Sequence, residues 1–183
     1  MRHPMEEEFN ASAGDILSAI QRGFRAQVDV KGKLAEYFLN KELERLKAAG
    51  ILDEVIWQDK DGEPDFLVTY RGRRIRVECK NVRSKELFRD PPAFKIEIQK
   101  TRNAIGGGPT RGYRADEFDV LAACLFNHTK QWTFLFSPAA SLRRRVDAPD
   151  FLQVMQPVPQ VVGHPWHESI KDAIREALRL AGE

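Results

Sequence analysis

Hydrophobic positions between residues 30 and 49 repeat every three or four residues, which is the period of one face of an α-helix. Gly50 follows this stretch, and glycine is the residue that most readily closes a helix in the left-handed conformation. We therefore predict an amphipathic helix over 30–49. Its buried face would contain Leu34, Ala35, Phe38, Leu39, Leu43 and Leu46.

Two further helices are predicted nearer the ends of the chain. Residues 1–14 are polar and expected to be flexible, and the helix after them would be capped by Ser12 or Asp15. Residues 167–181 again place apolar side chains at helical spacing and predict a closing helix.

A β-hairpin is predicted in the middle of the chain. Residues 66–70 are rich in β-branched and aromatic types, and residues 74–80 alternate strictly between apolar and polar. Arg71-Gly72-Arg73 lies between them and supplies the glycine that a tight turn needs. In the second strand, Glu78 and Lys80 should project from one face and Cys79 from the other.

Three other strands are expected around this hairpin. Residues 51–57 form the first, residues 118–126 are apolar enough for a central strand buried on both faces, and residues 132–136 add one more. The order of elements indicates a single α/β domain over 1–183, with a central mixed β-sheet flanked by helices.

Two parts of the chain have a weaker pattern. Residues 81–90 are polar and basic, and Pro91-Pro92 interrupts the chain after them. Phe94, Ile96 and Ile98 alternate as in a short strand, although a helix is also compatible with them. Residues 156–165 are rich in proline and valine and indicate an irregular connection.

The ends of the hairpin carry the most informative chemistry. Asp65 would lie at the start of the first strand, and it can meet Glu78 and Lys80 across the pair if the register is right. Two carboxylates with room between them suit Mg²⁺, and an adjacent ammonium can orient water and offset phosphate charge. The alternative is a solvated ladder of charges. Pro-Asp and Asp/Glu-x-Lys steps each occur twice in the chain, at 64–65 and 149–150 and at 29–31 and 78–80.

Pro64-Asp65 followed by Glu78-Cys79-Lys80 resembles the signature of the PD-(D/E)xK nuclease superfamily, which has the restriction-endonuclease-like fold. The resemblance implies that Asp65, Glu78 and the backbone carbonyl of Cys79 bind Mg²⁺, for which Mn²⁺ can substitute, and that Lys80 assists the attacking water. It also implies a further glutamate on an upstream helix and a glutamine after the second strand. Their candidates are Glu36, otherwise an exposed helix residue, and Gln99.

Positive charge is concentrated around and after this hairpin. The net charge of the chain is +2, yet residues 71–114 contain 13 basic and 4 acidic residues. This segment would attract a nucleic-acid backbone; the alternative interpretation is a solvated basic surface without a binding role. We expect residues 81–114 to be a DNA-binding insert. The candidate DNA-binding residues are Arg74, Arg76, Arg83, Lys100, Arg102, Arg111 and Arg114.

These features together predict a Mg²⁺-dependent endonuclease that cuts double-stranded DNA as a homodimer, most like a type II restriction enzyme. The alternatives are a structure-specific repair or recombination nuclease of the junction-resolvase type, a nuclease of the same fold that cuts RNA, and a non-catalytic DNA-binding module.

Other chemistries find little support. A zinc site is not indicated, because neither cysteine has metal-ligand spacing to the pair His164 and His167. Without a phosphate-binding loop, a nucleotide cofactor is not expected. Cys79 and Cys124 lie in apolar runs and are expected to be reduced core residues of a cytoplasmic protein, with a disulfide as the minority interpretation. No apolar stretch reaches membrane-spanning length.

Overall fold

The computed structural model describes residues 2–58, 60, 62–100 and 112–182. The chain divides into two compact units, Met1–Leu34 and Ala35–Glu183. The first unit is helical, and its helix α1 (Pro4–Glu8) lies in the segment that was expected to be flexible. Ser12 caps α2 (Ala13–Arg22), because its Oγ accepts a hydrogen bond from the backbone N–H of Asp15 at 3.1 Å.

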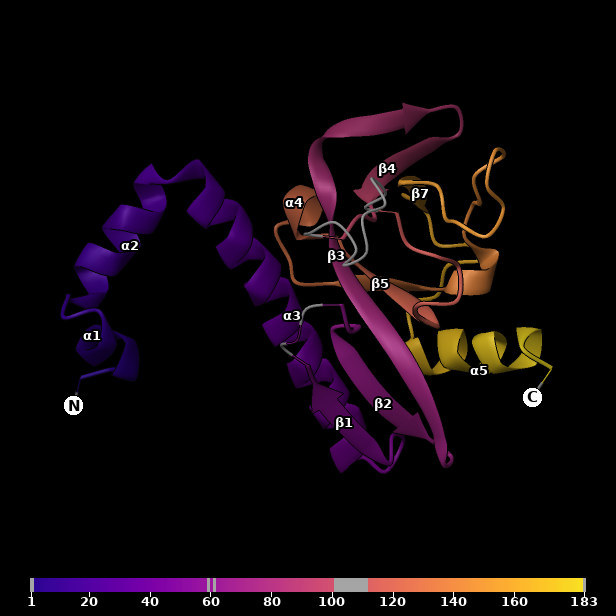
Figure 1. The fold of residues 1–183 in the computed structure, drawn as a ribbon, viewed down its shortest axis with the longest axis horizontal. Coiled ribbons are helices and arrows are strands. Elements are labelled where there is room, and N and C mark those ends of the chain that lie inside the picture. The colour runs from indigo at the N-terminus through magenta and orange to yellow at the C-terminus, as the bar shows by residue number, and fades with distance from the viewer. Residues whose placement is uncertain (1, 59, 61, 101–111, 183) are drawn as a thin grey trace. The chain divides into compact units, whose positions relative to one another are not determined.

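The second unit begins within α3 (Phe24–Ala48) and is built on a mixed β-sheet (Figure 1). One part of this sheet has the order β1-β2-β3-β5-β6, and β4 and β7 extend it from the far half of β3. The β3–β5 pairing is parallel, and the other strand pairings are antiparallel. The strands are β1 (Glu54–Trp57), β2 (Phe66–Tyr70), β3 (Arg73–Arg89), β4 (Pro92–Glu97), β5 (Val120–Cys124), β6 (Phe134–Pro138) and β7 (Met155–Pro159).

Two hydrophobic cores cover the two faces of the sheet. Residues 35–46 of α3 and the first turns of α5 (Ile170–Leu180) pack on the face that carries Val77 and Cys79. The second core lies on the opposite face, with Val82 from β3 and Leu121 from β5. Helices that pack on a central mixed sheet confirm the predicted fold class. Because successive strand residues face opposite sides, Glu78 and Lys80 project toward the second core.

The predicted hairpin of β2 and β3 is confirmed, with a turn of two residues. Arg71 has a φ of 51° and Gly72 a φ of 74°, so both occupy the left-handed region that such a turn requires. The strands pair Tyr70 with Arg73 and Phe66 with Val77. The turn therefore fixes the register of the two strands along their whole length.

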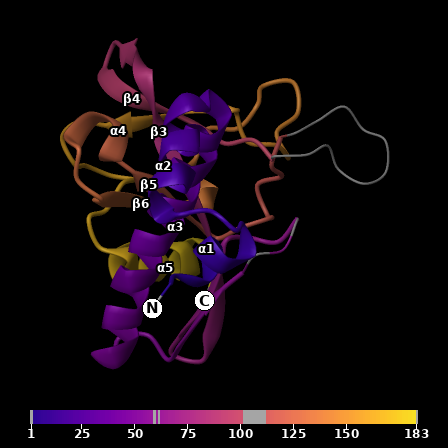
Figure 2. The same cartoon turned by 90° about the vertical axis from the view of Figure 1, so that its left-hand side faces the viewer.

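Two predicted boundaries were wrong. Residues 81–89 continue β3 and pair with β4, so the polar segment is half of a second hairpin, which Figures 1 and 2 show extending from the sheet. Residues 155–159 form β7 instead of an irregular connection. The alternation of Phe94 and Ile96 does mark a strand, Pro92–Glu97, and the helical alternative does not hold. Proline is tolerated in β7 because this strand lies at the edge of the sheet, where a missing N–H costs no ladder bond. The short helix α4 (Phe126–Thr129) lies between β5 and β6.

Both cysteines are buried and free, as the sequence indicated. No helix in the described part of the chain is long and apolar enough to cross a membrane.

The packing of α3 on the sheet should dominate the stability of the second unit. Leu43 is fully buried, so Leu43→Ala should lower the free energy of unfolding by about 2–5 kcal/mol through lost burial and a residual cavity. Leu180 is 42% exposed, and Leu180→Ala should change the same quantity by less than about 1 kcal/mol. Urea denaturation measures both, and equal losses would contradict this arrangement of the core.

Candidate active site

The register of the β2–β3 hairpin brings the predicted acidic pair together. Extending the pairing of Phe66 with Val77 by one residue places Asp65 opposite Glu78. The Oδ2 atom of Asp65 accepts a hydrogen bond from the backbone N–H of Cys79 at 2.8 Å and lies 3.8 Å from the Nζ atom of Lys80. Asp65, Glu78 and Lys80 therefore converge, as the sequence predicted.

Pro64 and Asp65 lie directly before β2, at the point where the β2–β3 ladder stops. Proline has no N–H to donate to a partner strand, so Pro64 does not extend the ladder with a donor of its own. Beyond the last paired residues, Phe66 and Val77, the Cys79 N–H donates to the side chain of Asp65. Since the N–H and C=O of a strand residue point to the same edge, the carbonyl of Cys79 also faces this position. The Pro-Asp step thus lies at the end of the ladder, where the carboxylate of Asp65 and the carbonyl of Cys79 are close together.

Glu78 is the most buried charged group of the site, with 3% of its side chain exposed. Its Oε1 atom accepts hydrogen bonds from the Nζ of Lys80 and from the hydroxyl of Tyr113, the latter at 2.6 Å. Its Oε2 atom is buried and has no hydrogen-bond partner among the described residues. An unpaired buried carboxylate oxygen is costly, so this atom is well suited to a cation.

Lys80 balances the negative charge of the two acids. Burial disfavours its ammonium form, but the charges of Glu78 and Asp65 outweigh that effect and raise the pKa of Lys80. Lys80 is therefore a cation at neutral pH in this arrangement. It is a hydrogen-bond donor and a counter-charge to the two carboxylates.

Tyr113 is a site residue that the sequence analysis missed. It lies 35 positions from Glu78, and only the tertiary fold brings the two together. Burial raises the pKa of the Tyr113 hydroxyl, the Lys80 charge lowers it, and the Glu78 charge raises it further. The hydroxyl therefore stays protonated and remains a hydrogen-bond donor to the carboxylate.

The predicted third carboxylate does not join this site. Glu36 belongs to α3, which packs on the Cys79 face of the sheet, and its Oε2 accepts a hydrogen bond from the indole N–H of Trp57 at 3.1 Å. Across the described residues, no group of three or more acidic, histidine or cysteine side chains could hold a metal ion. Any metal would thus rely on two carboxylates together with backbone, water or substrate oxygens. Gln99 forms an isolated antiparallel β-bridge with Gly112, the residue directly before Tyr113.

Most of the predicted DNA-binding cations already have carboxylate partners. Arg76 makes a two-pronged ion pair with Asp119, with N–O distances of 3.1 and 2.8 Å, so part of its charge is already compensated. Two other cations are paired in the same way, and a weaker contact of 3.2 Å joins a third cation to a neighbouring acid. These contacts are Arg83 with Glu97, Lys100 with Glu117, and Arg114 with Asp116. Arg74 is exposed. The predictions for Arg102 and Arg111 lie outside the described residues.

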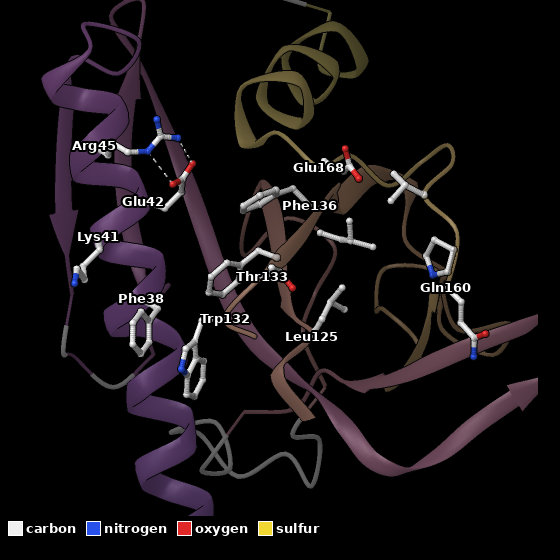
Figure 3. Close-up of a pocket in the computed structure, with 14 residues that line it drawn as sticks. Phe38, Lys41, Glu42, Arg45, Leu125, Trp132, Thr133, Phe136, Gln160 and Glu168 are labelled. Carbon is white, nitrogen blue, oxygen red and sulfur yellow. Dashed lines mark hydrogen bonds and ion pairs between the residues drawn. The ribbon is translucent and has the colours of Figure 1, made fainter. Parts of the chain in front are cut away.

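Two other features were considered as sites. Figure 3 shows a groove of about 690 Å³ between α3 and the β6 strand, where Phe38 lies beside Trp132, but its lining is mostly apolar and lacks the paired acids of a catalytic centre. The two histidines His164 and His167 both contact the carboxylate of Glu176, at 2.8 and 2.5 Å. This contact connects the segment before α5 to the helix and does not form a metal site.

Comparisons with known proteins give only distant structural likeness. No family model matches the chain, and no curated protein matches its sequence. Among solved structures, the chain is similar to a bacterial homing endonuclease, I-Ssp6803I, with a TM-score of 0.42 and 17% identity, over 61% of this chain and 68% of that chain. We draw no functional conclusion from a likeness of this size.

Lys80 should be important for stability when no metal is bound. Lys80→Met leaves Glu78 buried without its cation and should lower the free energy of unfolding by about 3 kcal/mol in metal-free buffer. Lys47 forms a surface ion pair with Glu44 at 3.7 Å, and Lys47→Met should cost about 0.5 kcal/mol or less. Urea denaturation compares the two variants. A Lys80→Met protein as stable as Lys47→Met would show that the charges at the site are not coupled.

Proposed function

We propose that this protein is a metal-dependent endonuclease that hydrolyses phosphodiester bonds in double-stranded DNA, and that Mg²⁺ is its cofactor. The observation that carries the proposal is the convergence of Asp65, Glu78 and Lys80 at the point where the β2–β3 ladder ends. Two acids can hold a divalent cation and an adjacent ammonium can stabilise negative charge, and both functions serve metal-assisted phosphodiester hydrolysis.

The residues present fit a small divalent cation. Asp65 and the buried Oε2 of Glu78 would be its carboxylate ligands, and the carbonyl of Cys79 would be its backbone ligand. Mg²⁺ commonly binds one or two carboxylates and completes its shell with water and substrate phosphate. When bound, the ion would polarise the scissile phosphate and lower the pKa of a coordinated water.

Lys80 would provide the remaining positive charge. Its side chain is 26% exposed, and its ammonium lies beside both carboxylates, whose charges favour the protonated form. From that position it can donate a hydrogen bond to the attacking water and stabilise negative charge that develops on the phosphate.

The substrate class follows from charge and is the less direct part of the proposal. Residues 71–114 carry an excess of nine positive charges around the site, which favours binding of a phosphate backbone. Several of these cations are already paired with acids, so the excess is smaller at the described surface than in the sequence. Cutting both strands of a duplex requires two sites, and we therefore propose a homodimer of the type II restriction kind.

The proposal predicts cleavage of plasmid DNA that depends on Mg²⁺ and on the three converging residues. Asp65→Ala and Lys80→Ala should each reduce the rate at least about 100-fold, the usual scale for catalytic groups. Asp172 is an exposed acid on α5, with 54% of its side chain accessible, and Asp172→Ala should cut like the parent. Gel assays in Mg²⁺ and in EDTA measure these rates.

Several DNA sequences, a branched DNA and an RNA should be compared in the same assay. Cutting of branched DNA alone would replace the restriction-type assignment with a junction-resolving nuclease. Equal cleavage by the parent, Asp65→Ala and Lys80→Ala would overturn the site. Duplex binding without cleavage of any substrate would identify a non-catalytic DNA-binding module.

A further inference from the structure

The hydroxyl of Tyr113 donates a hydrogen bond to one oxygen of Glu78, so the two oxygens of that carboxylate have different surroundings. Oε1 accepts from both Tyr113 and Lys80, whereas Oε2 has no partner among the described residues and is buried. A carboxylate held at one oxygen by fixed donors presents the other in a fixed direction. Such outer contacts commonly orient metal ligands and tune the affinity of the site.

The Tyr113 ring is itself held from several directions. Its edge meets the ring of Phe118, with centroids 5.4 Å apart and an interplanar angle of 83°. The Nζ of Lys100 lies over its face at 5.5 Å, and the Lys100 ammonium is anchored by an ion pair with Glu117. The backbone carbonyl of Tyr113 accepts a hydrogen bond from the N–H of Leu152 at 2.9 Å. The hydroxyl is thus rigidly placed, as an orienting group must be.

We infer that Tyr113 is a positioning residue for the divalent cation: it holds Oε1 of Glu78 so that Oε2 is directed at the metal. Lys100 supports it by fixing the ring, which gives that lysine a role other than the predicted contact with DNA. The inference rests on the proposed function. It adds a residue that acts through Glu78 and does not touch the reacting atoms.

Tyr113→Phe removes the hydroxyl and keeps the ring with its contacts to Phe118 and Lys100. The affinity of the DNA-free protein for Mn²⁺, measured by isothermal titration calorimetry, should fall about 10-fold or more. Tyr70 is the matched control, because its hydroxyl is also buried yet has no hydrogen-bond partner among the described residues. Tyr70→Phe should bind Mn²⁺ with the affinity of the parent.

The same titrations separate the possible outcomes. If the parent binds Mn²⁺ and the affinity of Tyr113→Phe lies within twofold of the parent's, the positioning role is wrong and the proposed function is not affected. A parent that neither binds Mn²⁺ nor cuts DNA would refute both. A purely structural role would lower the stability of the metal-free protein and leave the Mn²⁺ affinity of the folded protein unchanged.

A second variant keeps the test decisive if Tyr113→Phe does not fold. Lys100→Met removes the ammonium over the ring and leaves the Tyr113 hydroxyl in place. Its Mn²⁺ affinity should fall by about 2–5-fold, less than for the direct outer contact of Tyr113, because Lys100 acts on Glu78 only through the position of the ring. An affinity equal to that of the parent would contradict the inference.

Discussion

The hydrogen bond from the Cys79 N–H to the Asp65 carboxylate is the contact on which the candidate site depends. It forms because the two-residue turn at Arg71 and Gly72 fixes the register of β2 with β3, and because the ladder stops at Phe66 and Val77, one residue short of Asp65. A shift of one residue would place Glu78 and Lys80 on the helix-covered face. The position of the acids is therefore a consequence of turn geometry and strand register.

Burial then gives these side chains properties that they would lack on an open strand. Glu78 projects into the second core, where its charge must be compensated, and Lys80 and Tyr113 provide two donors to a single oxygen. The other oxygen is left buried without a partner in the described part of the chain. Two carboxylates against one ammonium leave the site with an excess of negative charge, which favours a positively charged ligand that binds carboxylate oxygen.

Much of the fold could be predicted, because local patterns determined it. Alternation over residues 74–80 and the glycine at position 72 predicted the hairpin and the convergence of Asp65 with Glu78. Contacts between distant segments were out of reach: the ion pair of Arg76 with Asp119 spans 43 positions, and Tyr113 reaches Glu78 across 35. The two interpretations of Glu36 could not be separated for a related reason, since helical spacing shows which residues face the core but not which strand face the helix covers. β7 was not predicted because it contains prolines, which usually indicate an irregular segment but are tolerated in edge strands.

The central claim is that a divalent cation binds between Asp65 and Glu78, and anomalous diffraction from Mn²⁺-soaked crystals tests it most directly. The account predicts a peak within about 2.0–2.4 Å of a carboxylate oxygen of Asp65 and of the Oε2 atom of Glu78, typical of oxygen ligands to small divalent ions. Mn²⁺ density only at another place, or none at saturating Mn²⁺, would contradict it.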